Sequence, residues 1–441
     1  MADTRPAGTT TLPPQRVPRR VAWGFIDQGL SSVSNFAITL LAARLLGPSG
    51  LGMVVIGFAT YLLALSFQRT LIAQPLVISS TSLGAADRSY AARASVTATL
   101  ALGVAATVLL AGIGLALGGA PGRGLVLVAP WMVAALLQDH WRTILFQEER
   151  GFAAASNDFA WVVAMAIAVP VAWELRTGWA VVGCWGFGAA VAAVVGLAQT
   201  RLAPAPLGTS WRWWHREAWP LGKWLAGEGV VYMAGSQATL FALVGILGTA
   251  AIGGLRAATT IFGPLTLLRP AVALPGLPAV TRAQATSPSR ATLLAMKLSG
   301  SLLALTLLYV LALAALRSQV LSVVFGGAFG RYGNLLLPIG TEQTAGALVI
   351  GFSLLLKVRR RGGPVLWSQA IGQGTTLTLA CALALRYGLV GAAWGMAGGA
   401  MAETLANVWF SLSRSNPPVL AGATGVGVRE PDRREAPPCR D

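Results

Sequence analysis

The sequence predicts an all-α polytopic membrane protein of about twelve spanning helices in two related halves, and three observations support this. Hydrophobic residues make up 55% of the chain and charged residues only 11%, with a mean hydropathy of +0.64. Soluble domains carry about 25% charged residues. Stretches such as 94–122 and 177–200 contain no charged residue. The third observation is a repeat of the first helix pattern later in the chain.

The repeat has a constant offset of 201 residues, as from Trp23 to Trp224, and needs no gap. The other matching residues are Asp27 with Glu228, Leu46-Gly47 with Leu247-Gly248, and Leu51-Gly52 with Ile252-Gly253. Two homologous halves in a membrane are typical of transporters whose site lies between the halves. Six spans return the chain to its starting side, so we expect parallel repeats related by an axis along the membrane normal.

The spans follow from the apolar segments, each near the 17–25 residues that cross hydrocarbon. We expect them at about 21–45, 51–79, 93–119, 124–146, 153–174, 178–200, 221–247, 252–279, 294–316, 332–356, 363–386 and 388–412. Residues 21–200 would form an N-terminal six-helix bundle and residues 221–413 a C-terminal one. The cytoplasmic linker 201–220, rich in Trp and Arg, suits a helix at the membrane interface. Polar residues 1–20 and 414–441 are expected to be disordered and cytoplasmic.

The net charge of +17 reflects membrane orientation and anionic headgroups, and we do not expect nucleic acid as a partner. Basic residues gather in segments on the side of the N-terminus, whereas the opposite turns hold only Arg123, Arg176, Arg317, Arg331 and Arg386. This asymmetry predicts that both termini are cytoplasmic in a multi-pass inner-membrane protein. The three cysteines show no metal-binding spacing, and no metal or cofactor is expected.

A family resemblance lies in the first repeat copy, which has the sequence WGFIDQGLSSVSN over 23–35, then ARLLGP over 43–48 and Leu51-Gly52. This start resembles Wzx-type polysaccharide flippases of the MATE-like MOP transporter superfamily. The resemblance implies two six-helix bundles in a V around a central cavity. It also implies movement of a polyprenyl-pyrophosphate-linked oligosaccharide to the outer leaflet, with membrane lipids and polysaccharide polymerase or export proteins as partners. MurJ-type members typically carry fourteen helices, which disfavours that branch.

Arginines inside predicted spans are the first candidate site. An ionisable residue in a span is costly and usually faces the bundle interior or a water-filled cavity. Arg69 maps by the repeat offset to position 270, next to Arg269. Because arginine binds phosphate oxygens bidentately and stays protonated, the two residues could clamp a pyrophosphate. The alternative is that each arginine pairs with a carboxylate or extends toward the headgroups.

Acids in the spans give further candidates. Asp27 and Glu228 could gate the cavity by pairing with the arginines, bind a coupling cation such as H⁺ or Na⁺, or pair structurally within each bundle. Asp139 and Arg142 are three residues apart on a helix and can meet as an internal ion pair, whereas His140 could carry a proton.

The second half adds polar residues to this set. Glu342 lies far from either end of its predicted span, and could line a cavity or hydrogen-bond two helices together. Glu403 with Asn407 and Gln369 with Gln373 are each four residues apart, so each pair shares a helix face.

Among functions, the sequence lacks a catalytic motif or a nucleotide-binding loop, so an enzyme is not expected and any energy comes from a gradient or from product removal. A glycan ligase or polymerase is disfavoured because the outer turns are short. The main alternative is a MATE-like drug/cation antiporter, which should favour an acidic cavity. A scaffold of a polysaccharide assembly complex, which would not transport, is a third possibility and would not require charges in the spans.

Overall fold

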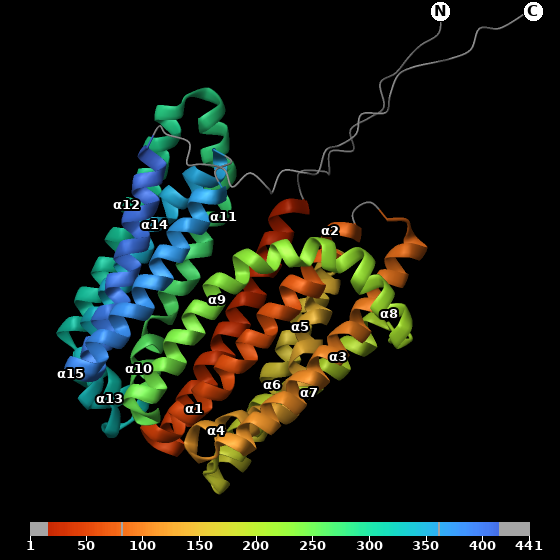
Figure 1. Ribbon diagram of the computed structural model, residues 1–441, viewed down its shortest axis with the longest axis horizontal. Coiled ribbons are helices and arrows are strands. Elements are labelled where there is room, and N and C mark those ends of the chain that lie inside the picture. The colour runs from red at the N-terminus through yellow and green to blue at the C-terminus, as the bar shows by residue number, and fades with distance from the viewer. Residues whose placement is uncertain (1–15, 81–82, 360–361, 414–441) are drawn as a thin grey trace, which may run out of the picture.

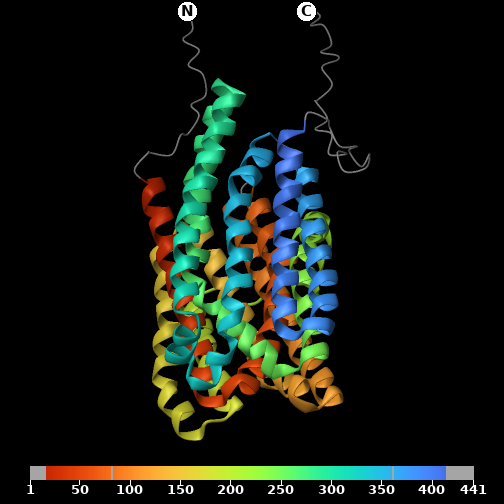
Figure 2. The same ribbon diagram turned by 90° about the vertical axis from the view of Figure 1, so that its left-hand side faces the viewer.

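A computed structural model describes residues 16–80, 83–359 and 362–413, and all regular secondary structure within these ranges is helical (Figures 1 and 2). Eight stretches there are long and apolar enough to cross a membrane. One of them, 363–412, contains two predicted spans, and another, 29–80, contains one predicted span and most of a second. The prediction of an all-helical polytopic membrane protein is therefore confirmed.

The first half begins with one long helix that is bent at a glycine. In α1 (Arg16–Gln68), Gly47 has φ 67° and ψ −171°, and this bend separates two of the predicted spans. A left-handed φ is costly for residues with a Cβ atom, which is why glycine suits the turn. The elements that follow are η1 (Arg69–Ala73), α2 (Gln74–Ser80), α3 (Ala85–Leu117), α4 (Gly119–Val128), η2 (Ala129–Trp131), α5 (Met132–Gln147), α6 (Gly151–Leu175) and α7 (Gly178–Thr200).

The second half follows a short linker that is helical, as the sequence predicts. The linker contains α8 (Leu207–Trp213) and η3 (Trp214–Ala218). The next elements are α9 (Trp219–Leu247), α10 (Thr249–Ile261), α11 (Gly263–Thr286), α12 (Pro288–Ala315), α13 (Arg317–Phe325), η4 (Gly327–Leu335), α14 (Leu336–Val358) and α15 (Gly362–Leu412). Gly388, with φ 62°, bends α15 between its two predicted spans.

In the second half, one predicted span consists of two helices, and two further short elements are present. The segment 252–279 is broken at Phe262, where α10 ends and α11 begins with Pro264 in its first turn. An N–H group in the first turn of a helix has no partner within the helix, so proline, which lacks this group, is tolerated there. The new helix therefore starts just before Pro264. The short elements α13 and η4, between α12 and α14, were not predicted.

The helices form two groups that diverge toward the end where α1 begins and α15 ends (Figure 1). We call this end the terminal end and the opposite end the far end. One group contains most of α1 with α3 to α7, and the other contains α11, α12, α14 and α15 (Figures 1 and 2). Helix α9 packs on α15, and its first residues also lie against η1, where Gly222 is close to Thr70 and Leu71.

The two halves meet through a reciprocal glycine contact between α1 and α10. A Cβ atom at Gly52 would overlap the carbonyl oxygen of Thr249, and one at Gly253 would overlap the carbonyl oxygen of Pro48. These four residues are related by the repeat offset, because 48 corresponds to 249 and 52 to 253. The repeat seen in the sequence is therefore also present as a contact in space. A buried apolar core surrounds it and includes residues of both halves, such as Leu51 and Ile252.

Candidate functional site

The first half holds a charge cluster where η1 meets α5. Arg69 places Nε 3.0 Å and an Nη atom 2.5 Å from the two carboxylate oxygens of Asp139, a bidentate ion pair. Arg142 lies 3.4 Å from the same carboxylate, so the predicted contact three residues apart forms. Arg142 also approaches Asp158 of α6 at 3.2 Å. Asp139 thus pairs with an arginine on either side of it.

In this cluster the arginine side chains are more exposed than the aspartate side chains. The Arg69 side chain is 49% exposed, whereas the Asp139 side chain is 5% exposed. Arg142 is 16% exposed and Asp158 6%. Gln138 donates to Asp158 at 2.7 Å and to Asn157 at 3.1 Å, which holds the buried acid in place. A molecule approaching this cluster meets guanidinium groups first, with the carboxylates behind them.

Two cavities border the cluster. One, of about 350 Å³, lies between η1, α2 and α5 and is lined by Arg69, Arg142 and Asp139 with apolar residues such as Val77. The other, of about 280 Å³, is lined by the same three residues, by Asp158 and by residues of α1. Arg69 therefore borders open space on two sides while it is held by Asp139.

His140 is separate from these cavities. Its ring is fully buried, with Nδ1 3.0 Å from the Gln68 amide and Nε2 2.9 Å from the Ser95 hydroxyl. Both ring nitrogens are thereby engaged, and the imidazole joins α1, α3 and α5. This arrangement is that of a structural polar contact between helices.

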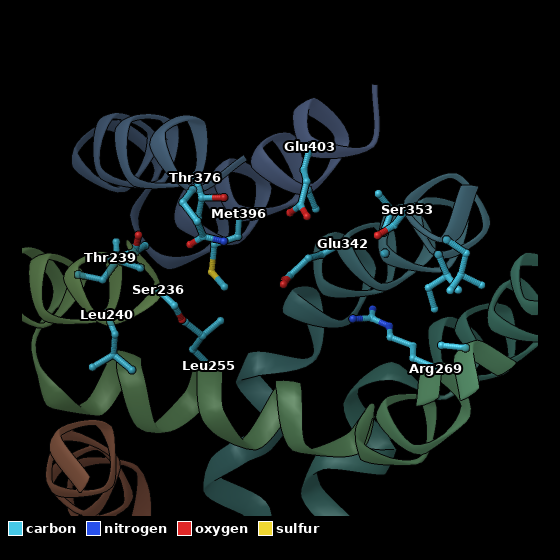
Figure 3. Close-up of a pocket in the computed structure, with 18 of the residues that line it drawn as sticks. Ser236, Thr239, Leu240, Leu255, Arg269, Glu342, Ser353, Thr376, Met396 and Glu403 are labelled. Carbon is cyan, nitrogen blue, oxygen red and sulfur yellow. The ribbon is translucent and has the colours of Figure 1, made fainter. Parts of the chain in front are cut away.

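The second half contains a third cavity, about 460 Å³, between α9, α11, α14 and α15 (Figure 3). Arg269, Glu342 and Glu403 are directed toward the same space (Figure 3). Arg269 donates to the side-chain oxygen of Gln343 at 2.7 Å. Gly346 leaves room for the guanidinium group, because a Cβ atom there would overlap it. Arg269 is thus held by a neutral amide, and neither acid bonds to it directly in the described structure.

Several oxygen atoms of this half are buried without a hydrogen-bond partner. Glu342 Oε2 is one of them, and Gln237 Oε1, Gln369 Oε1 and Asn407 Oδ1 are others. An unsatisfied buried acceptor costs about 1–3 kcal/mol. In the predicted pair of Glu403 and Asn407, the side-chain amide of Asn407 donates a hydrogen bond to the backbone carbonyl oxygen of Glu403, at 3.0 Å. Acceptors without donors are what a bound proton or cation would satisfy.

Of the predicted site residues, two acids have side chains that the structure does not describe, and the two arginines of the predicted clamp lie in different cavities. Asp27 lies in α1 and Glu228 in α9, but their side chains lie outside the described residues. Arg69 and Arg269 line different cavities, one in each half. Within the described part of the chain, no group of three or more His, Cys, Asp or Glu side chains is placed to hold a metal ion.

Two arginines in the membrane helices were not among the candidates. Arg44 of α1 contacts α13 across the halves. Arg256 is half-buried in α10, three residues after Gly253 and so one turn from the reciprocal glycine contact. The signal for both was present, since each is a single charge within an apolar run.

Comparison with known proteins finds no match among protein-family models and none among curated proteins. Solved structures do match. A lipid II flippase MurJ in an inward closed conformation aligns with a TM-score of 0.71 at 11% identity, covering 89% of this chain and 88% of MurJ. An inward-facing multidrug resistance MATE family transporter of the MOP superfamily gives 0.67 at 14% identity, covering 86% of this chain and 92% of the transporter.

A third match is a MOP superfamily transporter from Pyrococcus furiosus, whose binding pocket is described as having reverse polarity. It aligns with a TM-score of 0.59 at 14% identity, covering 90% of this chain and 94% of that transporter. At such low identity the matches show the fold alone, and they do not separate flippases from MATE transporters. Taken with the helical repeat and the long apolar helices, they show that this all-helical, multi-pass chain has the fold shared by these solved MurJ and MATE structures.

Proposed function

We propose that this protein moves a polyprenyl-pyrophosphate-linked glycan from the inner to the outer leaflet of the cytoplasmic membrane. The observation that carries the proposal is the exposure order in the first half. Arg69 is half exposed beside two cavities, whereas its carboxylate partner Asp139, which lines the same cavities, is only 5% exposed. A lipid pyrophosphate needs cationic groups where it crosses a low-dielectric region, and arginine supplies them in bidentate form.

In this proposal the headgroup enters from the terminal end, which faces the cytoplasm, and the polyprenyl tail stays in lipid. Arg69 and Arg269 neutralise the pyrophosphate from the two halves, with Arg142 close to Arg69. Asp27 and Glu228 act in this proposal as gating residues. The MurJ match supports a lipid-linked substrate, and the resemblance to Wzx-type flippases supports a glycan used for surface polysaccharide.

A second candidate function is a MATE-like cation antiporter. Glu342 and Glu403 favour it because they face the second-half cavity without a direct bond to Arg269. The same acids serve the first proposal if they carry a coupling ion, H⁺ or Na⁺, while the arginines bind the pyrophosphate. The two functions differ in which charge the substrate carries.

The test is translocation of a polyprenyl-pyrophosphate oligosaccharide in proteoliposomes by the wild type, Arg69→Gln/Arg269→Gln, and Arg123→Gln/Arg331→Gln as a control. The control residues are exposed and lie outside the cavities described here. We expect transport by the wild type and the control and loss in the first double variant. Because Arg69→Gln leaves the buried carboxylate of Asp139 with Arg142 as its remaining described ionic partner, Arg69→Gln/Asp139→Asn is assayed as a variant that keeps the site neutral.

The outcomes separate the parts of the proposal. Transport by every variant would retain the flippase and discard the arginine clamp. Inactivity of folded wild type with this lipid, together with proton-driven uptake of a cationic dye, would replace the flippase with the antiporter.

A further inference from the structure

A cross-half contact at the far end is made by Arg44, near the end of the first segment of α1. Its Nε donates to the carbonyl oxygen of Val324 at 2.8 Å, and an Nη atom donates to the carbonyl oxygen of Val323. Both carbonyls belong to the last turn of α13, in the second half. The contact therefore joins residues 280 positions apart in the chain.

The acceptor is the open C-terminal end of a helix. Gly326, with φ 110°, ends α13, and its N–H bonds back to the Ser322 carbonyl. The last carbonyls of a helix have no partner within the helix and carry the negative end of its dipole. A guanidinium group is a suitable cap for them. Arg44 thus caps a helix of the other half, and Phe36 adds a ring contact to Phe325 of α13, with centroids 6.4 Å apart.

The contact has no symmetric counterpart. The repeat offset places Gly245 at the position equivalent to Arg44, and a Cβ atom added at Gly245 would have no neighbour within 4 Å outside its own helix backbone. The reciprocal glycine contact, by comparison, occurs in both directions. Arg44 is therefore an addition specific to the first half, beyond the contact that the repeat supplies.

Reversibility follows from exposure. Arg44 is an exposed residue even while it binds the two carbonyls. Arg44 lies one residue from the end of its predicted span, 21–45, where a long basic side chain can extend to the membrane interface, so breaking the contact leaves no buried charge behind. A contact of this kind can form and break during each cycle of a transporter.

We propose that Arg44 is a latch that holds the far end closed while the terminal end is open, by capping α13 of the opposite half. The latch rests on the transporter fold and not on any particular substrate. Release of Arg44 from Val323 and Val324 is then part of opening the far end.

The test measures distances between spin labels in purified protein whose native cysteines are replaced. One label pair is Leu117→Cys with Leu311→Cys, at exposed positions in the last turns of α3 and α12, and the other is Ala86→Cys with Ser289→Cys at the terminal end. Neither pair lies on α13, so a local movement of α13 does not imitate separation of the halves. The background variants are Arg44→Gln, Arg44→Lys and, as a control, Arg123→Gln, whose side chain bonds within its own turn to Gly119.

We expect Arg44→Gln to lengthen the far-end distance and shorten the terminal-end distance. The ratio of far-end-open to far-end-closed protein should rise roughly tenfold, which corresponds to about 1.4 kcal/mol. Arg44→Lys should give a smaller rise because one ammonium does not span two carbonyls in the same fork. Arg123→Gln should match the wild type.

Distributions of Arg44→Gln that superimpose on the wild type in a monodisperse sample would overturn the latch. So would a wild-type distribution already dominated by the longer far-end distance. The readout needs no substrate, so failure of the flippase assay leaves this result interpretable.

Discussion

The two halves hold their membrane arginines in opposite ways. Arg69 in the first half forms a bidentate ion pair with Asp139, and every acid described in that cluster has an arginine or amide donor. Arg269 in the second half bonds to the neutral side chain of Gln343, and Glu342 keeps an oxygen without a donor. The first half thus pairs its buried acids with arginine and amide donors, whereas the second half leaves a carboxylate oxygen of Glu342 without a donor. We infer that a coupling ion, if one is used, binds in the second half, while the substrate meets arginines of both halves.

The largest expected difference between the halves comes from removing the partner of each arginine, Asp139 in the first half and Gln343 in the second. Asp139→Ala should lower the free energy of unfolding by about 3 kcal/mol, near the lower limit for a broken buried pair because Arg69 is half exposed. Gln343→Ala in the second half should cost only about 1 kcal/mol, a single hydrogen bond. Thermal unfolding in detergent gives both values. Equal losses would show that the halves do not differ in how they hold arginine.

The two halves differ in how they hold arginine, but they are alike at the reciprocal glycine contact at the far end. Substitution of each glycine tests this likeness. Gly52→Ala and Gly253→Ala should each cost about 2 kcal/mol, since each new methyl group overlaps a backbone carbonyl and overpacking costs about 1–3 kcal/mol. Gly29→Ala, at a position with open space, serves as the matched control. Comparable melting shifts for the two variants are expected, and a tolerated change at one of them would show that the contact is not reciprocal.

The smallest expected effect concerns Glu342. Glu342→Gln should leave stability unchanged or raise it by about 1 kcal/mol, because the amide removes a buried charge whose oxygen lacks a donor. The same change should reduce any transport that depends on a proton or Na⁺ gradient. Melting temperature and gradient-driven transport are measured on the same preparation. A large loss of stability would instead assign Glu342 a structural role.

The sequence was a good guide to the spans and a poor one to side-chain partners. Long apolar runs define helices by themselves, and the predicted span 178–200 matches α7 at both ends. The contact of Asp139 with Arg142 also followed from helix geometry alone. The bond from Arg69 to Asp139 did not, because it depends on how η1 packs against α5, 70 residues away.

Short elements were missed for a related reason. The segment that forms α13 and η4 contains Arg317, Gln319 and several glycines, so its composition resembles a loop. Arg44 from the other half binds the last carbonyls of α13. An interaction between distant segments of this kind leaves no local pattern in the sequence.

The reciprocal contact at Gly52 and Gly253 also bears on the origin of the molecule. In a symmetric dimer, residue i of one subunit touches residue j of the other, and j touches i in return. The carbonyls of Pro48 and Thr249 meet the two glycines in this pattern within one chain. The contact therefore has the form of an ancestral subunit interface, preserved after two copies of a half-length protein became joined. Arg44, which has no image in the second half, belongs to the divergence that joining the copies permitted.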